Sequence, residues 1–471
     1  MERRCCANLT SLQAAPAGGP KFRYADFSGT MWNQALEAVA NIYQIDVPST
    51  AIANRLRCSL KRASGVVVPW RYSTMTTAWL AFLCLVSSPC HAQIPDVLCK
   101  EGSGLFEAAF HTGVKVRVGA AKKGGLARRL CEAAMSWDQH NELVATDAFQ
   151  LDVDTFGVDL GVGAPVVTLQ VKKSSADRCM TYLIYSLQKP SRLLRTITGG
   201  DFFSAADTDL DGRVEIWSHD AAAVAGFETF VLGELDAPPT IVLRFEGGRL
   251  LDVSSEFQSY FDREIAKIRE KIDQQDLLDF KRSNGALTPP TALSAEQLHR
   301  LRRVKARVLE IVWAYLYSGR EQEAWRSLAE MWPAADVARI RTAVLDARAH
   351  GIRAEVDGVS TGGAGGKKKR VALLDATSRS GPGKSEIISP RPIQLRRPPL
   401  SGPAQSLPES ELLLDLVIDS AGKVRSAEPA GKTKWADAEL LRATEEWKFI
   451  PAFKGNRPVA CRSRLAVTLT R

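Results

Sequence analysis

Asp419-Ser420-Ala421-Gly422-Lys423-Val424 lies between two strand-like segments near the C-terminal end of the chain. Residues 412–418 predict a strand, the Asp-Ser-Ala-Gly residues form a turn, and Lys423-Val424 continues the chain in the opposite direction. A helix is predicted over residues 436–446, which Pro451 stops, and residues 465–469 predict a closing strand. This order predicts a small, independently folded α/β module at 410–471.

Two further stretches continue the pattern. Trp447-Lys448-Phe449-Ile450-Pro451-Ala452 follows the predicted helix, and Gly455-Asn456-Arg457-Pro458-Val459 precedes the last strand. In order and spacing these residues resemble the C-terminal domain of the TonB energy-transducer family. The resemblance implies a helix packed on an antiparallel sheet and an envelope or outer-membrane protein as partner. One departure is that Ser406-Leu407-Pro408 stands where that family has a Tyr-Pro pair.

Composition and charge place the whole chain among modular globular proteins. It has 471 residues, of which 45% are hydrophobic and 24% charged, with a net charge of +9. Residues 1–74 contribute nine Lys or Arg and four Asp or Glu, and residues 351–410 contribute ten and five. The remaining residues therefore sum to about −1. Because a nucleic-acid binder concentrates positive charge on a folded face, nucleic acid is not expected as a partner.

The longest apolar run, residues 78–86, predicts a signal peptide over 75–92. Nine residues are too few to cross a bilayer, which takes about 20, but they suit a leader core, and Cys90-His91-Ala92 offers a cleavage site. We expect cleavage near Ala92, a mature chain that begins near Gln93, and a periplasmic or secreted location. Residues 1–74 are then a spurious upstream or disordered segment. The alternative is a buried helix in a cytoplasmic protein.

Four cysteines follow the predicted leader: Cys99, Cys131, Cys179 and Cys461. None forms a C-x-x-C pair, so spacing gives a zinc site no support. In an oxidising compartment Cys99 and Cys131 are candidates for a disulfide, with unpaired buried thiols as the alternative.

Residues 93–255 predict a β-rich domain. Val114, Val116 and Val118 alternate with charged residues, and Val167, Leu169 and Val171 alternate with Thr168 and Gln170, which is the period of a half-buried sheet. Gly247-Gly248 separates two strand-like runs and predicts a tight hairpin. One short helix is predicted over residues 126–137.

Residues 256–350 predict helices, since the apolar period changes to three or four. The stripe consists of Phe257, Phe261, Ile265, Ile268 and Ile272. Ser294 and Gln297 form a capping-box pattern, Gly319 suits a helix end, and Pro333 suits a first turn. Aromatic residues from 313 to 325 resemble one tetratricopeptide unit, but no second copy occurs, so an ordinary helical hairpin is the preferred interpretation.

Residues 351–409 predict a basic linker rich in glycine and proline. Gly358-Val359-Ser360-Thr361-Gly362 spells G-x-S-x-G, but neither the strand nor the helix of a nucleophile elbow is predicted around it. Gly366-Lys367 lacks the other residues of a phosphate-binding loop. We interpret both as accidents of composition.

An acidic loop predicts a calcium site. Its candidate ligands occupy positions 1, 3, 5, 7 and 9 of a nine-residue loop with glycine sixth, and they are Asp207, Asp209, Asp211, Arg213 (through its backbone carbonyl) and Glu215. Ser218 stands at position 12, where an EF-hand has a bidentate glutamate. The strand-like flank resembles the calcium loops of integrin-type propeller blades. The alternative is an acidic surface turn without metal.

These features predict an α+β multidomain fold with a β-rich N-terminal domain, a helical hairpin region, a Pro-rich linker and a small TonB-like α/β C-terminal domain. The predicted function is that of an exported, non-enzymatic cell-envelope protein of bacterial type. One alternative is a TonB-type energy transducer in outer-membrane transport, and another is a hydrolase in the β-rich domain. For the hydrolase, His111, His140 and His219 are not spaced as metal pairs, and Ser218-His219-Asp220 is contiguous and cannot form a triad by itself.

Overall fold

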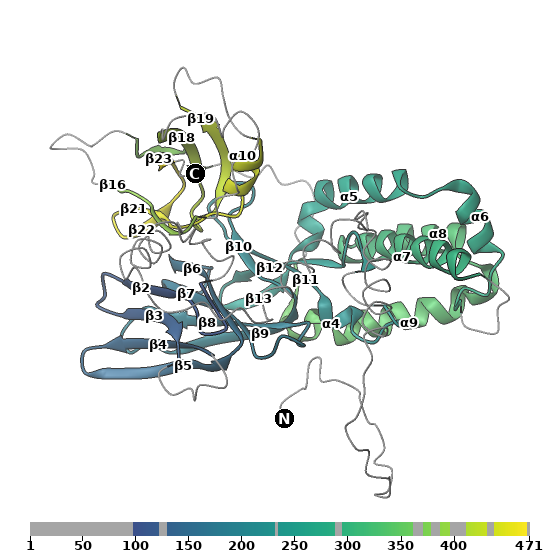
Figure 1. Ribbon diagram of the computed structural model, residues 1–471, viewed down its shortest axis with the longest axis horizontal. Coiled ribbons are helices and arrows are strands. Elements are labelled where there is room, and N and C mark those ends of the chain that lie inside the picture. The colour runs from purple at the N-terminus through teal and green to yellow at the C-terminus, as the bar shows by residue number, and fades with distance from the viewer. Residues whose placement is uncertain are drawn as a thin grey trace, which may run out of the picture. The chain divides into compact units, whose positions relative to one another are not determined.

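The computed structural model describes residues 98–121, 130–230, 234–287, 294–360, 371–377, 387–395, 411–430 and 438–468. Within these residues the chain is a mixed α+β fold, β-rich between residues 99 and 220, and the predicted fold class is confirmed at this level (Figure 1). The predicted signal peptide at 75–92 and the upstream segment 1–74 lie outside the described residues. Among the described helices, none has the length and apolar character needed to cross a membrane.

Two antiparallel sheets form the first half of the β-rich region, in the orders β2-β3-β4-β5 and β1-β6-β7-β8-β9. Their strands are β1 (Cys99–Lys100), β2 (Leu105–Ala109), β3 (Lys115–Ala120), β4 (Cys131–Trp137), β5 (His140–Ala148), β6 (Gln150–Val158), β7 (Val166–Lys172), β8 (Met180–Ser186) and β9 (Leu193–Gly200). One apolar core lies between these sheets and includes Val116, Val118 and Leu169.

The alternation that predicts half-buried strands holds for β3 but not for β7. In β3, Val116 and Val118 are buried while Lys115 is exposed. In β7, Thr168 and Gln170 are buried together with the valines and leucine between them. Both polar side chains are hydrogen-bonded: Thr155 N donates to Thr168 Oγ1 over 3.0 Å, and Phe203 N donates to Gln170 Oε1 over 2.7 Å. The prediction of one solvated face is therefore wrong for β7.

The helix predicted over residues 126–137 is wrong where the structure describes it. Residues 131–137 are strand β4, which pairs antiparallel with β3 on one edge and with β5 on the other. Cys131, Ala133, Met135 and Trp137 are buried at every second position. Pairing on both edges satisfies the backbone of the strand, and the alternate side chains fill the core.

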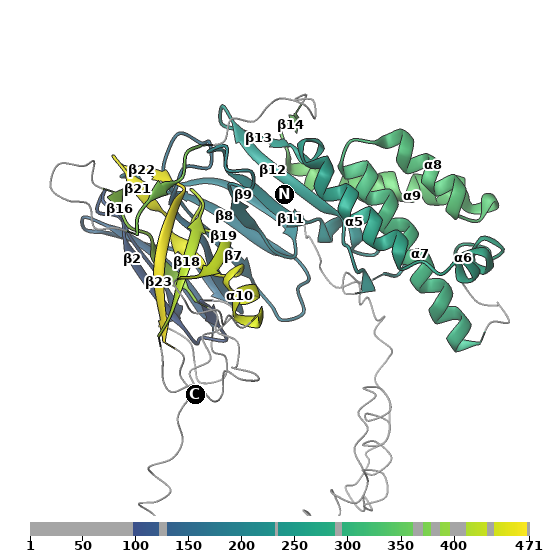
Figure 2. The same cartoon turned by 90° about the horizontal axis from the view of Figure 1, so that it is seen from above.

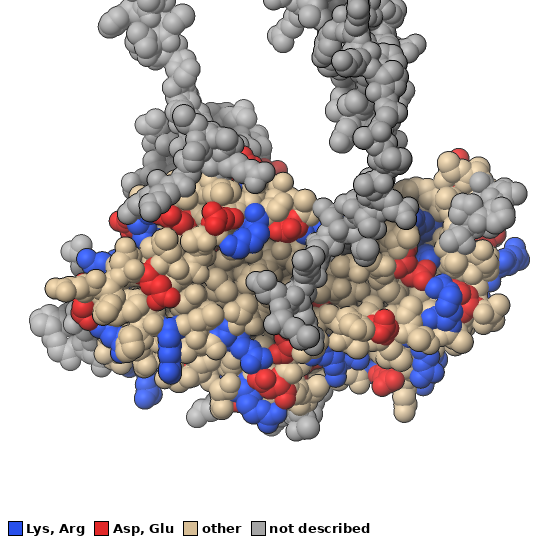
Figure 3. Space-filling model, turned by 90° about the horizontal axis from the view of Figure 1, so that it is seen from below, with Lys and Arg blue, Asp and Glu red and all other residues tan. Residues whose placement is uncertain are grey.

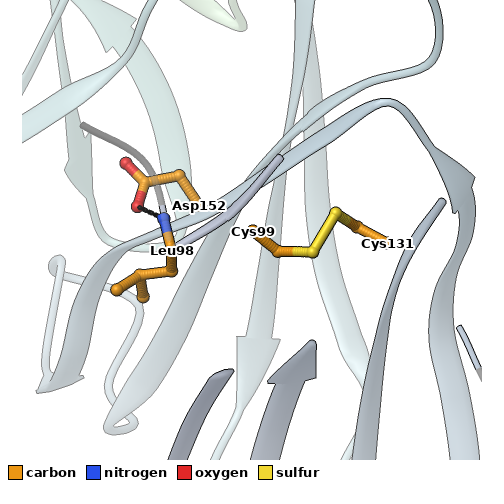
Figure 4. The surroundings of a disulfide bond; sticks show 4 residues. All are labelled: Leu98, Cys99, Cys131 and Asp152. Carbon is orange, nitrogen blue, oxygen red and sulfur yellow. Dashed lines mark hydrogen bonds between the residues drawn. A yellow bond between two sulfur atoms is a disulfide. The ribbon is translucent and has the colours of Figure 1, made fainter. Parts of the chain in front are cut away.

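A disulfide joins the two sheets. Cys99 in β1 is bonded to Cys131 in β4, with 6.0 Å between their Cα atoms, which confirms the predicted pairing (Figure 4). Beside it, Leu98 N donates a 3.4 Å hydrogen bond to Asp152 Oδ1 of β6. Cys461 is a buried free thiol, and burial raises its pKa to about 12.

A third sheet has the order β10-β11-β12-β13-β14. Its strands are β10 (Ser204–Ala206), β11 (Glu215–His219), β12 (Thr240–Glu246), β13 (Arg249–Asp252) and β14 (Gly358–Val359). The predicted hairpin at Gly247-Gly248 is confirmed: both glycines have positive φ angles, of 57° and 80°, and Glu246 pairs with Arg249 across the turn. Two consecutive positive φ angles are what a two-residue hairpin turn requires.

The helices that follow share a core with this sheet. They are α4 (Ala221–Val224), η2 (Ser254–Phe257), α5 (Gln258–Glu270), α6 (Gln274–Lys281), α7 (Ala295–Tyr317), α8 (Glu321–Met331), η3 (Ala334–Asp336), α9 (Val337–His350) and η4 (Ile352–Glu355). The predicted stripe from Phe257 to Ile272 is buried, and the capping box of Ser294 and Gln297 is present. Gly319 has a φ of 79° after α7, as predicted. Strand residues such as Leu243 and helix residues such as Trp313 belong to one apolar cluster.

The C-terminal region combines residues of the predicted module with strands from the preceding segment. It contains β15 (Leu374–Asp375), β16 (Ile387–Ile388), β17 (Arg391–Gln394), β18 (Glu411–Ile418), β19 (Val424–Pro429), α10 (Ala438–Thr444), β20 (Lys448–Ile450), β21 (Ala452–Lys454), β22 (Arg457–Val459) and β23 (Cys461–Thr468). The main sheet has the order β15-β23-β18-β19, and α10 lies beside β19 (Figure 2). The segment predicted as a linker thus supplies β15, β16 and β17, which pair with β23, β21 and β20.

Two of the three sequence stretches on which the resemblance was based, 419–424 and 447–452, meet in this region. Gly422 has a φ of 83°, and a Cβ atom on it would lie 1.9 Å from the carbonyl oxygen of Phe449. The backbones are joined by a 2.8 Å hydrogen bond from Phe449 N to Gly422 O. Glycine is therefore required at this turn both for its φ angle and for the close approach.

Candidate metal site

The loop between β10 and β11 brings three of the predicted metal ligands together. Asp207, Asp209 and Asp211 each place a carboxylate oxygen within 4.8 Å of the others. The turn is made by Leu210 and Gly212, whose φ angles are 59° and 87°. Glycine at the sixth position thus has the role that the sequence predicts. Crowded carboxylate oxygens are the donors that Ca²⁺ prefers.

Asp207 is the buried member of the group. Its Oδ2 accepts hydrogen bonds from Gly212 N over 3.1 Å and from Ser420 Oγ over 3.0 Å. Its Oδ1 is also buried and has no hydrogen-bond partner among the described residues. Burial raises the pKa of Asp207 above its usual value. A cation beside Oδ1 would offset the cost of burying this oxygen without a hydrogen bond. The residues present therefore fit an oxygen-coordinated metal ion.

Glu215 and the side chain of Arg213 form contacts that the sequence did not predict, and the predicted role of the Arg213 carbonyl stays a prediction. Glu215 is fully buried at the start of β11, where its Oε2 accepts a 3.1 Å hydrogen bond from Thr208 N and its Oε1 lies 3.7 Å from Arg244 Nη1. Burial raises the pKa of Glu215 to about 8. It lies outside the group of three carboxylates described above. Arg213 binds Asp211 through its side chain, with Nε and Nη2 at 2.9 and 2.7 Å from Oδ2, and so competes with a cation for that carboxylate.

Sequence reasoning missed Asp419 and Ser420, which reach the loop from the turn between β18 and β19. Asp207 N donates a 3.1 Å hydrogen bond to Asp419 Oδ2, and Asp419 Oδ1 accepts from Ala421 N and Lys423 N, each over 2.9 Å. Burial raises the pKa of Asp419 to about 7. The turn was recognisable in the sequence, but no local spacing relates it to a loop more than 200 residues earlier.

Two buried ion pairs join this turn and the neighbouring strand β20 to β6 of the β-rich region. Lys423 Nζ pairs with Asp154 Oδ1, and Lys448 Nζ pairs with Asp152 Oδ2. Asp154 Oδ2 also accepts hydrogen bonds from Tyr182 Oη over 2.7 Å and from Ala205 N over 2.8 Å. Burial lowers the pKa of Lys423, although its carboxylate partner opposes that change. The turn therefore contacts the β-rich region through the acidic loop and through Asp154 of β6.

Ser218, His219 and Asp220 each have a separate hydrogen-bond partner among the described residues. Ser218 Oγ donates a 2.6 Å hydrogen bond to the carbonyl oxygen of Phe202. The residue at position 12 of the loop pattern therefore binds the main chain just before β10. His219 Nδ1 lies 3.2 Å from Asp201 Oδ2. Asp220 instead accepts hydrogen bonds from Tyr317 Oη over 2.7 Å and from Ile352 N over 3.0 Å, and burial raises its pKa to about 6.

Acidic and basic side chains are interspersed on the face of the molecule drawn in Figure 3. The expectation that nucleic acid is not a partner stays a prediction. No protein-family model, curated protein or solved structure matches this chain.

Proposed function

We propose that this chain is an exported, non-enzymatic protein of a bacterial-type cell envelope. Its mature form begins near Gln93 and is periplasmic or secreted, residues 93–350 form a body with a calcium-stabilised loop, and residues 410–471 form a TonB-like domain that binds an envelope or outer-membrane protein. The observation that supports this most is the contact of the acidic loop with the Asp419-to-Val424 turn. A cation at the loop would stabilise the junction between the body and the interaction domain.

Two buried ion pairs near this contact favour an interaction domain that stays fixed on the body over a domain that transmits force. Lys423 and Lys448 are buried against Asp154 and Asp152, and breaking either pair exposes a charge that has lost its partner. The transducer alternative instead requires an N-terminus that stays in the inner membrane. The two proposals therefore differ in the fate of residues 75–92.

Fractionation of cells that make the full-length chain tests the location. We expect a protein released with the periplasmic or extracellular fraction, and we expect Edman sequencing or mass spectrometry to place its first residue near Gln93. An intact Met1 in the cytosol would contradict the proposal. A membrane-bound chain that retains residues 78–86 would support the transducer instead.

Calcium is expected to raise the melting temperature of the mature chain. If the dissociation constant lies in the range of about 10⁻⁴–10⁻³ M that is typical of extracellular modules, 10 mM calcium stabilises the fold by about 1–3 kcal/mol. Thermal melts with and without calcium, together with calorimetric titration, measure this.

Variants of the loop separate metal binding from fold stability. Asp209→Asn combined with Asp211→Asn should abolish the calcium-dependent shift, whereas Asp346→Asn, at an exposed position of α9, should retain it. Asp207→Ala is less informative alone, since it also removes the acceptor of Gly212 N and Ser420 Oγ. If calcium does not change the melting temperature of the wild-type chain, the metal site is contradicted and the loop is an acidic turn without metal.

A further inference from the structure

A second polar site lies away from the acidic loop, in a cavity of about 210 Å³. Its walls come from the segment 236–240, from α5 and α7, and from His219 at the end of β11. The charged side chains that line it are the carboxylates Asp236, Glu264 and Glu310, and no Lys or Arg is among the described lining residues. The cavity is therefore an acidic environment.

Glu310 is the carboxylate of this cavity that forms no ion pair among the described residues, although Arg307 attracts it at longer range. Its side chain belongs to α7 and only 2% of the residue is exposed. Its Oε1 accepts hydrogen bonds from Asp236 N over 2.6 Å and from Ala237 N over 3.2 Å. Its Oε2 is buried and has no hydrogen-bond partner among the described residues. A buried oxygen of this kind is costly unless a donor reaches it.

The other two carboxylates already have cationic partners outside the cavity. Asp236 Oδ2 lies 3.0 Å from Lys271 Nζ and 3.1 Å from Arg307 Nη2. Glu264 Oε1 lies 2.7 Å from Lys267 Nζ. Glu310 has no ion pair of this kind among the described residues, and burial raises its pKa above the usual value. A cation that enters the cavity would therefore have its strongest interaction with Glu310.

Apart from His219 and Thr240, the remaining side chains of the walls are apolar or aromatic, and they determine what kind of cation fits. Phe261, Ile268 and Ala314 supply apolar surface, and Tyr260 adds an aromatic ring. A bare divalent ion takes six or more oxygen ligands, which these side chains do not provide. An ammonium group needs only a few acceptors, and the hydrocarbon part of an organic amine would pack on the apolar walls.

We propose that this cavity binds a small organic amine, whose ammonium group donates a hydrogen bond to Glu310 Oε2 and whose apolar body packs against Phe261 and Ile268. The volume lies below the range of about 300–1,000 Å³ of pockets for drug-sized ligands, so the ligand is of amino-acid size. This site is separate from the acidic loop and does not depend on the proposed function.

Phenethylamine is a suitable probe, because 2-phenylethanol and phenylacetate have nearly the same shape without the positive charge. Calorimetric titration of the full mature chain should show phenethylamine binding at least tenfold more tightly than either analogue. Glu310→Gln keeps an oxygen for Asp236 N and Ala237 N but removes the charge, and it should weaken amine binding by about ten- to a hundredfold. Glu330→Gln, on the exposed side of α8, should leave the affinity unchanged.

A second variant tests the site independently, in case Glu310→Gln fails to fold. Ala314 lies one helical turn after Glu310 and lines the same cavity, so Ala314→Leu should fill the space and abolish binding while Glu310 is intact. The proposal is overturned if the amine and the alcohol bind equally, if the affinity survives Glu310→Gln, or if neither phenethylamine nor hexylamine binds at about 10 mM.

Discussion

Replacing Asp154 by alanine is expected to lower the free energy of unfolding by about 3–5 kcal/mol, because it leaves Lys423 as an uncompensated buried charge. Asp154 is 1% exposed, and its two carboxylate oxygens accept hydrogen bonds from Lys423 Nζ, Tyr182 Oη and Ala205 N. All three donors lose a carboxylate acceptor in the variant, and Lys423 Nζ keeps only the main-chain carbonyl oxygen of residue 154, at 3.1 Å. Urea denaturation of the full chain, followed by circular dichroism, measures the loss.

Two controls identify the ion pair as the cause. Asp262→Ala removes the partner of Arg320 at a site where the carboxylate is 58% exposed, and exposed pairs contribute only about 0–1 kcal/mol. Combining Asp154→Ala with Lys423→Met removes both charges, so the double variant should lose less stability than the sum of the single changes. An Asp154→Ala chain that unfolds at the same urea concentration as wild type would show that the pair does not hold the turn.

Replacing Trp447 by alanine should also cost about 3–5 kcal/mol, since truncating a buried aromatic side chain leaves a cavity. Trp447 is fully buried between α10 and β20, in a core that includes Leu414, Ile418 and Leu440. That loss is a large part of the total stability of about 5–15 kcal/mol of a typical domain. Denaturant titration with intrinsic tryptophan fluorescence is the measurement.

Leu413 offers the matched control for Trp447. It lies in β18 next to the buried Leu414 but is 42% exposed, so Leu413→Ala should change the free energy of unfolding by about 0.5 kcal/mol or less. Equal effects of Trp447→Ala and Leu413→Ala would contradict the assignment of this core.

Local patterns predicted the elements whose signals lie within a few residues. Gly247-Gly248 makes the hairpin, the stripe from Phe257 to Ile272 is buried, and Ser294 caps α7 with Gln297. Each of these depends on backbone conformation or on side chains one helical turn apart. The sequence alone is sufficient for such features.

The errors concern contacts between distant parts of the chain. Residues 131–137 look helical in isolation, but β3 and β5 pair with them, and the disulfide to Cys99 fixes their place. Thr168 is buried because a second core covers the other face of its sheet, which alternation does not reveal. The acidic loop was visible as a motif, yet its contact with Asp419 depends on how two separate turns pack.

The contact between Asp207 and Asp419 also has a consequence for synthesis. It joins residues 212 positions apart, and contacts of such long range form late, because closing the intervening chain costs entropy. Protein chains generally fold domain by domain from the N-terminus as they are made. The β-rich region would then fold before Ser420 and Lys423 leave the ribosome. A chain that ends early would retain Asp152 and Asp154 as buried carboxylates without their lysines, and it would be less stable than the complete chain.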